Sequence, residues 1–199
     1  MSFSVAHRLP DMRQLMVTEF VTLDGVMEAP GGEPTHPHAG WVQDYFDEEL
    51  GAYKAQETFD AESLLLGRVT WESFSGAWPT YEGAMADAMN SMPKHVVSST
   101  LQNPGWNSTV IDGSGDVVAA VRALKDGDGG PVLIAGSCRL VHTLMLSGLV
   151  DTLRLQLFPV SIGSGLRVFP DDQVKLGFTL ANQRTFPKGV LALEFTSTI

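Results

Sequence analysis

The sequence contains little cysteine and little positive charge. Cys138 is the only cysteine among the 199 residues, which excludes a disulfide within the chain and a cysteine-rich zinc site. Lysine and arginine number 13 against 23 aspartates and glutamates, so the formal net charge is −10, and no run of basic residues occurs. Because nucleic acids and anionic membrane surfaces are bound mainly through basic surfaces, we expect neither as a partner.

Long hydrophobic runs are missing as well. No apolar stretch approaches the roughly 20 residues of a membrane-spanning helix, and residues 1–13 lack the apolar centre of a signal peptide. We therefore expect a cytoplasmic protein in which local clusters of positive groups hold any anionic ligand. Hydrophobic residues make up 44% of the chain, enough for one well-buried core. The prediction is an N-terminal tail over residues 1–14 and a single domain over residues 15–199.

Segments typical of strands alternate with segments typical of helices. Strands are predicted at residues 15–22, 63–66, 94–98, 109–111, 131–135 and 149–160, and a hairpin is predicted from 178–184 and 190–196. Helices are predicted at residues 41–59, 70–74, 83–90, 116–125 and 139–146. This alternation predicts an α/β fold with a mixed, mostly parallel central sheet, helices on both faces and a C-terminal antiparallel hairpin at one edge.

Three polar turns follow predicted buried strands: Gly67-Arg68-Val69-Thr70, Ser98-Ser99-Thr100, and Gly136-Ser137. Ligands of an open α/β sheet bind beyond the carboxyl ends of its strands. Backbone N–H groups at a helix start, together with a guanidinium, bind phosphate well. The three turns therefore predict a ligand with several phosphate groups, although each turn alone is equally consistent with helix capping. No Walker motif and no G-x-G-x-x-G fingerprint after a strand occurs, so a kinase or an ATPase is not expected.

The run from Gly67 to Ser73 resembles the G-R-x-T-W-E-S motif of dihydrofolate reductases. The wider pattern resembles more closely the reductase domain at the C-terminus of the bifunctional riboflavin-biosynthesis deaminase–reductase. The matching segments are Thr22-Leu23-Asp24-Gly25 and residues 94–99, 132–137 and 149–163. This resemblance implies a dihydrofolate-reductase-like fold, NADPH as cofactor, and hydride transfer to a small heterocyclic substrate such as a ribosylated aminopyrimidine. The zinc motifs of the deaminase half do not occur.

The resemblance also implies roles for particular residues. Arg68 and Thr70 would meet phosphates, Ser98 and Ser99 would lie at the 2′-phosphate end, and the Asp24 loop would pass near the nicotinamide. For Asp24, a role in supporting the loop and a role as an ordinary turn residue remain equally open. The implied cofactor-binding set is Asp24, Gly25, Gly67, Arg68, Thr70, Ser98, Ser99, Ala135, Gly136 and Ser137.

The proton donor is less clearly marked. Dihydrofolate reductases carry a carboxylate on the first helix, and Asp44 is the candidate because it would share a helical face with Trp41. A solvated acidic face is the alternative interpretation. Trp78, Phe158 and Gly163 are candidates for the wall of a substrate pocket, with core packing or chain turning as the alternatives.

Several expectations concern partners and other chemistry. Beyond a small-molecule substrate, we expect a homodimer paired through the closing strands. No metal is expected, because Glu33, His36 and His38 lie in a loop rich in proline and glycine that is typical of exposed residues. Cys138 is expected to be a buried thiol rather than a nucleophile. Dihydrofolate reduction and a non-catalytic NADP-binding regulatory module remain alternative functions.

Overall fold

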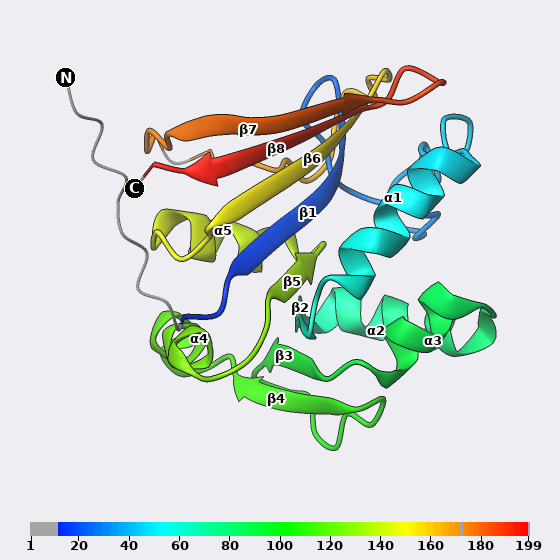
Figure 1. The fold of residues 1–199 in the computed structure, drawn as a ribbon. Coiled ribbons are helices and arrows are strands. Elements are labelled where there is room, and N and C mark those ends of the chain that lie inside the picture. The colour runs from blue at the N-terminus through cyan, green and yellow to red at the C-terminus, as the bar shows by residue number, and fades with distance from the viewer. Residues whose placement is uncertain (1–11, 172, 199) are drawn as a thin grey trace.

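The apolar runs of the sequence lie side by side in one twisted sheet of eight strands (Figure 1). This computed structural model describes residues 12–171 and 173–198. The strand order is β4-β3-β2-β5-β1-β6-β8-β7. The strands are β1 (Leu15–Thr22), β2 (Ser63–Gly67), β3 (Lys94–Ser98), β4 (Ser108–Asp112), β5 (Val132–Ala135), β6 (Thr152–Phe158), β7 (Phe178–Thr185) and β8 (Leu191–Ser197). β1 to β6 run parallel, and β8 pairs antiparallel with both β6 and β7, which confirms the predicted fold class.

Helices cover both faces of the sheet. They are α1 (Glu48–Phe59), α2 (Arg68–Ala77), α3 (Ala84–Ser91), α4 (Val117–Asp126) and α5 (Cys138–Leu146), with a short 3-10 turn over Trp78–Thr80. Figure 1 shows α1, α2 and α3 on one side of the sheet and α4 and α5 on the other. Alternate side chains of β1 serve the two layers: Leu15 and Val17 pack with α4 and α5, whereas Met16 packs with α2 and α3.

The first helix begins later than predicted. The expected helix over residues 41–59 starts only at Glu48, because Asp47 adopts extended backbone angles and accepts a hydrogen bond from the Leu50 N–H at 2.9 Å. Trp41 and Val42 are nevertheless buried, in turns packed around Phe158. The near-helical spacing of Trp41 and Tyr45 therefore comes from loop packing and not from a helix.

Two other boundaries differ from the predictions. Residues 149–160 were expected as one strand, but β6 covers only Thr152–Phe158, since Leu149 still bonds the end of α5 and Pro159 follows the strand. Of the tail predicted over residues 1–14, residues 1–11 lie outside the described part of the chain. Arg13 is 8% exposed and donates to the Ser63 hydroxyl at 2.8 Å and the Gly130 carbonyl at 2.9 Å, so it belongs to the folded body.

Within residues 12–171 and 173–198, no helix is both long and apolar enough to cross a membrane.

Candidate functional site

The direction of the chain changes between β1 and β5. These strands are neighbours in the sheet, but β1 leads through α1 to β2 on one side, and β5 leads through α5 to β6 on the other. Open α/β sheets bind ligands beyond the carboxyl ends of the two strands at such a switch point, and we call this region the crevice. The register places Thr18 of β1 beside Ala135, the last residue of β5, so β1 continues past the end of its neighbour.

Two of the three predicted turns meet at this crevice. The Gly67 N–H donates to the Ser137 hydroxyl at 2.7 Å, and that hydroxyl donates to Thr70 Oγ1 at 2.9 Å. A Cβ on Gly136, which has a φ of +69°, would lie 3.0 Å from the Thr70 methyl group. A Cβ on Gly67 would lie 3.2 Å from the Ser137 side chain. The turns thus approach closely enough that both glycines are needed for the contact.

The helices that follow these turns begin without side-chain caps. Asp47 and Asp116 cap α1 and α4, but within the described residues no side-chain cap is made at the start of α2 or α5. Ser137 has the left-handed angles φ 70° and ψ 53°, and its hydroxyl contacts Gly67 and Thr70 instead of its own helix. α3 is also uncapped, but it does not follow a strand. The first-turn N–H groups and positive dipole ends of α2 and α5 therefore remain available to an anion at one crevice.

The other predicted phosphate ligands lie at its margin. Arg68 is the first residue of α2 and is exposed, with its Nη1 2.6 Å from Glu72 Oε1. The Ser98 hydroxyl accepts the N–H groups of Thr100 at 3.2 Å and Leu101 at 2.9 Å, so it already caps the turn after β3, while Ser99 is exposed. Because β2 separates β3 from β5, a ligand must extend along the sheet edge to reach both.

The sequence reasoning missed Glu19, which lies under this crevice. Glu19 follows Thr18 on β1 and is 4% exposed. Its Oε2 accepts the Gly136 N–H at 3.1 Å, and its Oε1 has no hydrogen-bond partner among the described residues. Burial raises the pKa of this carboxyl to about 8. The alternation of residues along β1 could have indicated its burial. Val17 and Val21 occupy the same face of the strand, so Glu19 interrupts an inward-facing row of apolar side chains.

Asp24 joins two loops beyond the sheet. Its carboxylate accepts the Thr22 hydroxyl at 2.6 Å, the Gly163 N–H at 2.7 Å and the Ile162 N–H at 3.3 Å. These bonds, first of all the one from Thr22, hold the pKa of the carboxyl well below its usual range. Gly25 follows with a φ of +80° and accepts the Val168 N–H at 3.0 Å. This geometry favours the loop-supporting interpretation of Asp24.

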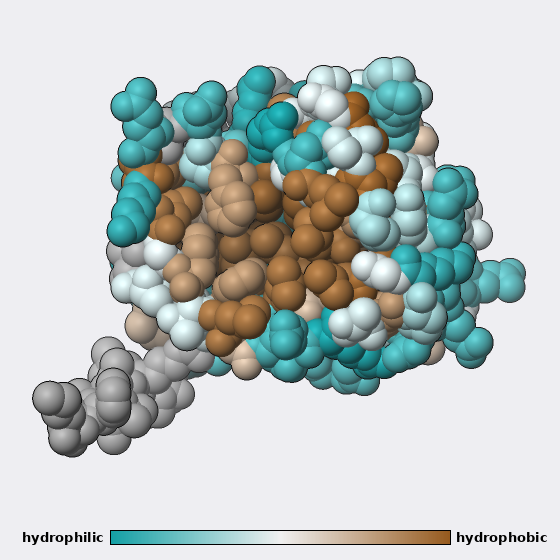
Figure 2. Space-filling view, turned by 90° about the horizontal axis from the view of Figure 1, so that it is seen from above, coloured by the Kyte–Doolittle hydropathy of each residue, from teal (hydrophilic) through white to brown (hydrophobic). Residues whose placement is uncertain are grey.

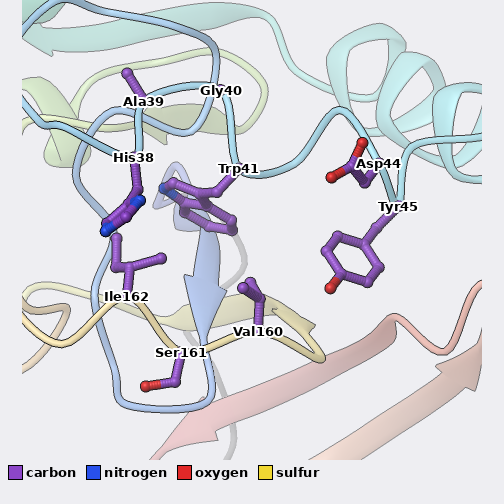
Figure 3. A pocket seen from close by; sticks show the side chains of 9 residues that line it. All are labelled: His38, Ala39, Gly40, Trp41, Asp44, Tyr45, Val160, Ser161 and Ile162. Carbon is purple, nitrogen blue, oxygen red and sulfur yellow. The ribbon is translucent and has the colours of Figure 1, made fainter.

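The segment that Asp24 holds forms one wall of a pocket. The pocket has a volume of about 330 Å³. Figure 3 shows its lining: His38, Ala39, Gly40, Trp41, Asp44, Tyr45, Val160, Ser161 and Ile162. The Trp41 indole N–H donates to the Glu28 carbonyl at 2.8 Å, and the Tyr45 hydroxyl donates to the Pro159 carbonyl at 3.4 Å. The pocket is therefore lined by anchored aromatic rings together with one carboxylate and one imidazole.

The structure places some of the predicted catalytic and substrate residues at this pocket and others away from it. Asp44 lines the pocket but lies in an exposed turn before α1, so the predicted helical face shared with Trp41 does not exist. Gly163 directly follows the pocket residue Ile162. Phe158 is 0% exposed, and its ring packs edge-on against Trp41 at 5.3 Å, so it supports the wall from within the core. Trp78 packs with Phe74 and Tyr81 in a separate cluster and does not line this pocket.

A second polar group that sequence reasoning missed lies on the opposite face of β1. Lys54 Nζ of α1 is 2.5 Å from Glu57 Oε2, 2.6 Å from Thr18 Oγ1 and 3.3 Å from Gln156 Oε1. The Thr18 hydroxyl donates to Glu57 at 2.9 Å, and the Arg154 guanidinium lies 3.8 Å from Glu57 Oε1. We call these five residues the α1 network. Its opposite charges are paired, so its evident effect is to fix α1 over β1 and β6.

The remaining candidates have simpler roles. Cys138 is 8% exposed and donates to the Arg167 carbonyl at 3.3 Å, and burial raises the pKa of its thiol to about 11. In the part of the chain that the structure describes, no three His, Cys, Asp or Glu residues are placed to hold a metal ion. His36 instead lies 3.3 Å from the Ser164 hydroxyl.

The chain is similar to known proteins in sequence and in fold. Along the sequence, 27% of 188 residues are identical to the uncharacterized protein YyaP of Bacillus subtilis (strain 168), covering 92% of this chain and 94% of that one. The fold is similar to a diaminohydroxyphosphoribosylaminopyrimidine deaminase/5-amino-6-(5-phosphoribosylamino)uracil reductase from Thermotoga maritima. The TM-score is 0.63 and the identity 16%, over 94% of this chain and 57% of the other. A dihydrofolate reductase from Enterococcus faecalis, complexed with NADP(H), has a TM-score of 0.58 and 15% identity over 94% of this chain and 97% of its own.

The chain also matches the model of a protein family. The model of the RibD C-terminal domain matches residues 13–192, which is nearly the whole of the described chain and begins at the buried Arg13. The chain therefore belongs to the RibD C-terminal domain family.

Proposed function

We propose that the protein is an NADPH-dependent reductase that transfers a hydride to a small heterocyclic substrate of the kind reduced in riboflavin biosynthesis. The observation that carries this proposal is the meeting of two uncapped helix starts, those of α2 and α5, at the switch point between β1 and β5. Membership in a reductase-domain family supports it.

The chain's own residues fit a dinucleotide along the carboxyl edge of the sheet. Its diphosphate would lie against the turn after Ala135, formed by Gly136 and Ser137, and against the first turn of α2 with Arg68 and Thr70. The 2′-phosphate would lie toward Ser98 and Ser99. The donor set is appropriate, because N–H groups, hydroxyls and a guanidinium all bind phosphate oxygens. Arg68 is exposed and can exchange Glu72 for a phosphate.

The pocket of Figure 3 is the proposed substrate site. Asp24 and Gly25 would position its wall next to the nicotinamide, since Asp24 binds the N–H groups of Ile162 and Gly163. The rings of Trp41 and Tyr45 would accommodate a flat heterocycle. When bound, NADPH supplies the hydride. Asp44, at the rim, would deliver or relay the accompanying proton.

One observation favours a second candidate. Asp44 is exposed, and no other carboxylate is among the residues that line the pocket in the described chain. A non-catalytic module that binds NADP would need no such acid. Dihydrofolate reduction is a further candidate, and the fold similarity to the Enterococcus faecalis enzyme supports the fold alone.

Titration of the protein with NADPH and NADH, followed by quenching of its tryptophan fluorescence, tests the cofactor. We expect NADPH to bind more tightly than NADH. Arg68→Ala should weaken NADPH binding about tenfold or more, since a hydrogen bond to a charged group contributes about 1.5–3 kcal/mol. Arg122→Ala, which removes an exposed arginine of α4, is the matched control.

The outcomes separate the candidates. Failure of both nucleotides to bind would eliminate every function proposed above. Because both nucleotides carry the diphosphate, Arg68→Ala should weaken NADPH and NADH alike, and a loss confined to NADPH would contradict the contact of Arg68 with the diphosphate. If NADPH binds, its oxidation with a ribosylated aminopyrimidine supports the main proposal, its oxidation with dihydrofolate supports folate reduction, and no oxidation with either supports the non-catalytic module.

We also propose a homodimer formed through the closing strands. Figure 2 shows a broad apolar area on the side of the molecule that carries β7 and β8. Exposed apolar side chains in and just before β7 include Val174 at 56% and Leu180 at 48%. Apolar side chains gathered on an exposed face are typical of interaction sites. Light scattering should give a molar mass of twice that of one chain for the native protein. Leu180→Lys should lower the molar mass to that of a single chain. A monomeric native protein would contradict the proposal.

A further inference from the structure

Glu19 is a buried acid that the proposed function does not yet use. It lies under the switch-point crevice. The single hydrogen bond of its carboxyl group comes from the N–H of Gly136, the first residue of the turn proposed to receive the diphosphate. Its second oxygen, Oε1, is buried without a partner in the described residues. The opposite face of β1 differs, because every buried side-chain nitrogen and oxygen atom of the α1 network has a hydrogen-bond partner.

The surroundings of Glu19 determine its protonation. Within the described chain no salt bridge reaches it, and it lies among apolar side chains packed between β1 and α5. An ionised carboxylate with one backbone hydrogen bond in such a place is strongly disfavoured, so the group is neutral near pH 7.

The charged and titratable groups around Glu19 are few. Lys54 of α1 acts on it electrostatically, but that ammonium is bound to Glu57 and Thr18 on the other side of the sheet. Cys138 of α5 interacts with Glu19 and is itself influenced by Arg139 and by Glu28 of the loop after β1. Burial raises the pKa of the Cys138 thiol to about 11, so it stays neutral over the range in which Glu19 titrates.

We propose that Glu19 is a positioning residue that, as a neutral acid, holds the Gly136–Ser137 turn for the diphosphate of a dinucleotide, so that binding requires Glu19 to keep its proton. The proposal rests on the function given above. As an acceptor for the Gly136 N–H, Glu19 fixes the left-handed pair Gly136 and Ser137 that leaves the α5 N-terminus open. Once ionised, the same carboxylate would place a negative charge under the bound phosphates.

The test compares the pH dependence of NADPH binding in the native chain and in Glu19→Gln, measured by tryptophan quenching between pH 7 and 9.5. The amide keeps an acceptor for Gly136 but does not ionise. With a pKa of about 8 in the free protein, native affinity should fall by up to about thirtyfold over this range. Glu19→Gln should bind as the native chain does at pH 7 and change by less than about threefold.

A matched control is available at the other end of β5. Glu62 also accepts a backbone N–H, that of Gly130, but is 54% exposed. Glu62→Gln should retain the native pH dependence. Lys94, whose pKa burial lowers to about 8, titrates in the same range, but it is present in all three proteins and so does not affect the comparison.

A second measurement needs no variant and remains available if Glu19→Gln does not fold. Calorimetry of NADPH binding at pH 8.5, in two buffers of different ionisation enthalpy, should show uptake of a large fraction of one proton. Zero proton uptake, or equal pH dependence in the native chain and Glu19→Gln, would overturn the role of Glu19 and leave the reductase proposal standing. A lack of NADPH binding by the native chain at every pH would overturn the proposed function, and this inference with it.

Discussion

The two faces of β1 carry polar groups that are treated in opposite ways. Under α1, Thr18 belongs to a network in which Lys54 pairs with Glu57 and Gln156 bonds to both. Arg154 completes it by pairing with Glu57 and, more closely, with Glu194 of β8. One residue further along, Glu19 points to the other layer and has a single N–H partner. The first arrangement is built for rigidity, and the second leaves a group whose charge can change.

The difference teaches how one strand can serve structure and function together. Charges buried in pairs are stable in place only as long as both partners remain. A lone buried acid avoids the penalty of burying a charge by keeping its proton. Its charge, and hence the electrostatic field around it, therefore depends on pH. The network lies where α1 must be held, whereas the lone acid lies under the turn proposed to bind phosphate.

The largest expected effect comes from breaking the paired face. Glu57→Leu removes the carboxylate that pairs with Lys54 and leaves Arg154 with Glu194 alone, so it should lower the free energy of unfolding by about 3–5 kcal/mol. Urea denaturation at pH 7 measures it. Glu48→Leu, an exposed change on the same helix, should cost less than about 1 kcal/mol. The double variant Lys54→Met/Glu57→Leu should recover part of the loss; no recovery would contradict the charge-pairing explanation.

The next effect concerns the lone acid and is a stability effect, measured without ligand. The pKa of Glu19 is raised from 4.5 to about 8 in the folded state, so its contribution to stability is complete below about pH 4.5 and is lost as pH rises to about 8. The loss should be of the order of several kcal/mol. Urea denaturation at pH 5 and pH 9 should show Glu19→Gln losing much less stability than the native chain. Parallel losses in both proteins would mean that Glu19 does not titrate in this range.

Much of the fold could be predicted from the sequence because its signals are local. β1 and β3 coincide with the predicted ranges, since short apolar runs bounded by polar turns determine strands. The start of α1 could not be predicted from the same kind of signal. Trp41 and Tyr45 have near-helical spacing, but they are apolar because they surround Phe158, far away in the sequence.

The candidate site was predictable only where its parts are turns after strands. Gly67 and Gly136 meet as expected, because the carboxyl ends of parallel strands lie at one sheet edge. The pocket joins residues 38–45 to residues 160–162 through loops, and no local pattern indicates such a pairing. Glu19 and the α1 network could not be predicted, because the sequence does not show whether a charged side chain faces the solvent or the core.

The smallest expected effect isolates one hydroxyl of the paired face. Thr18→Val keeps the shape of the side chain but removes the oxygen that accepts from Lys54 and the proton donated to Glu57. Because Lys54 and Glu57 still hold each other, the free energy of unfolding should fall by only about 1–2 kcal/mol. Thr179→Val, at an exposed position of β7, is the control and should change it by less than about 0.5 kcal/mol. A loss for Thr18→Val as large as that for Glu57→Leu would mean that the hydroxyl, rather than charge pairing, holds this face together.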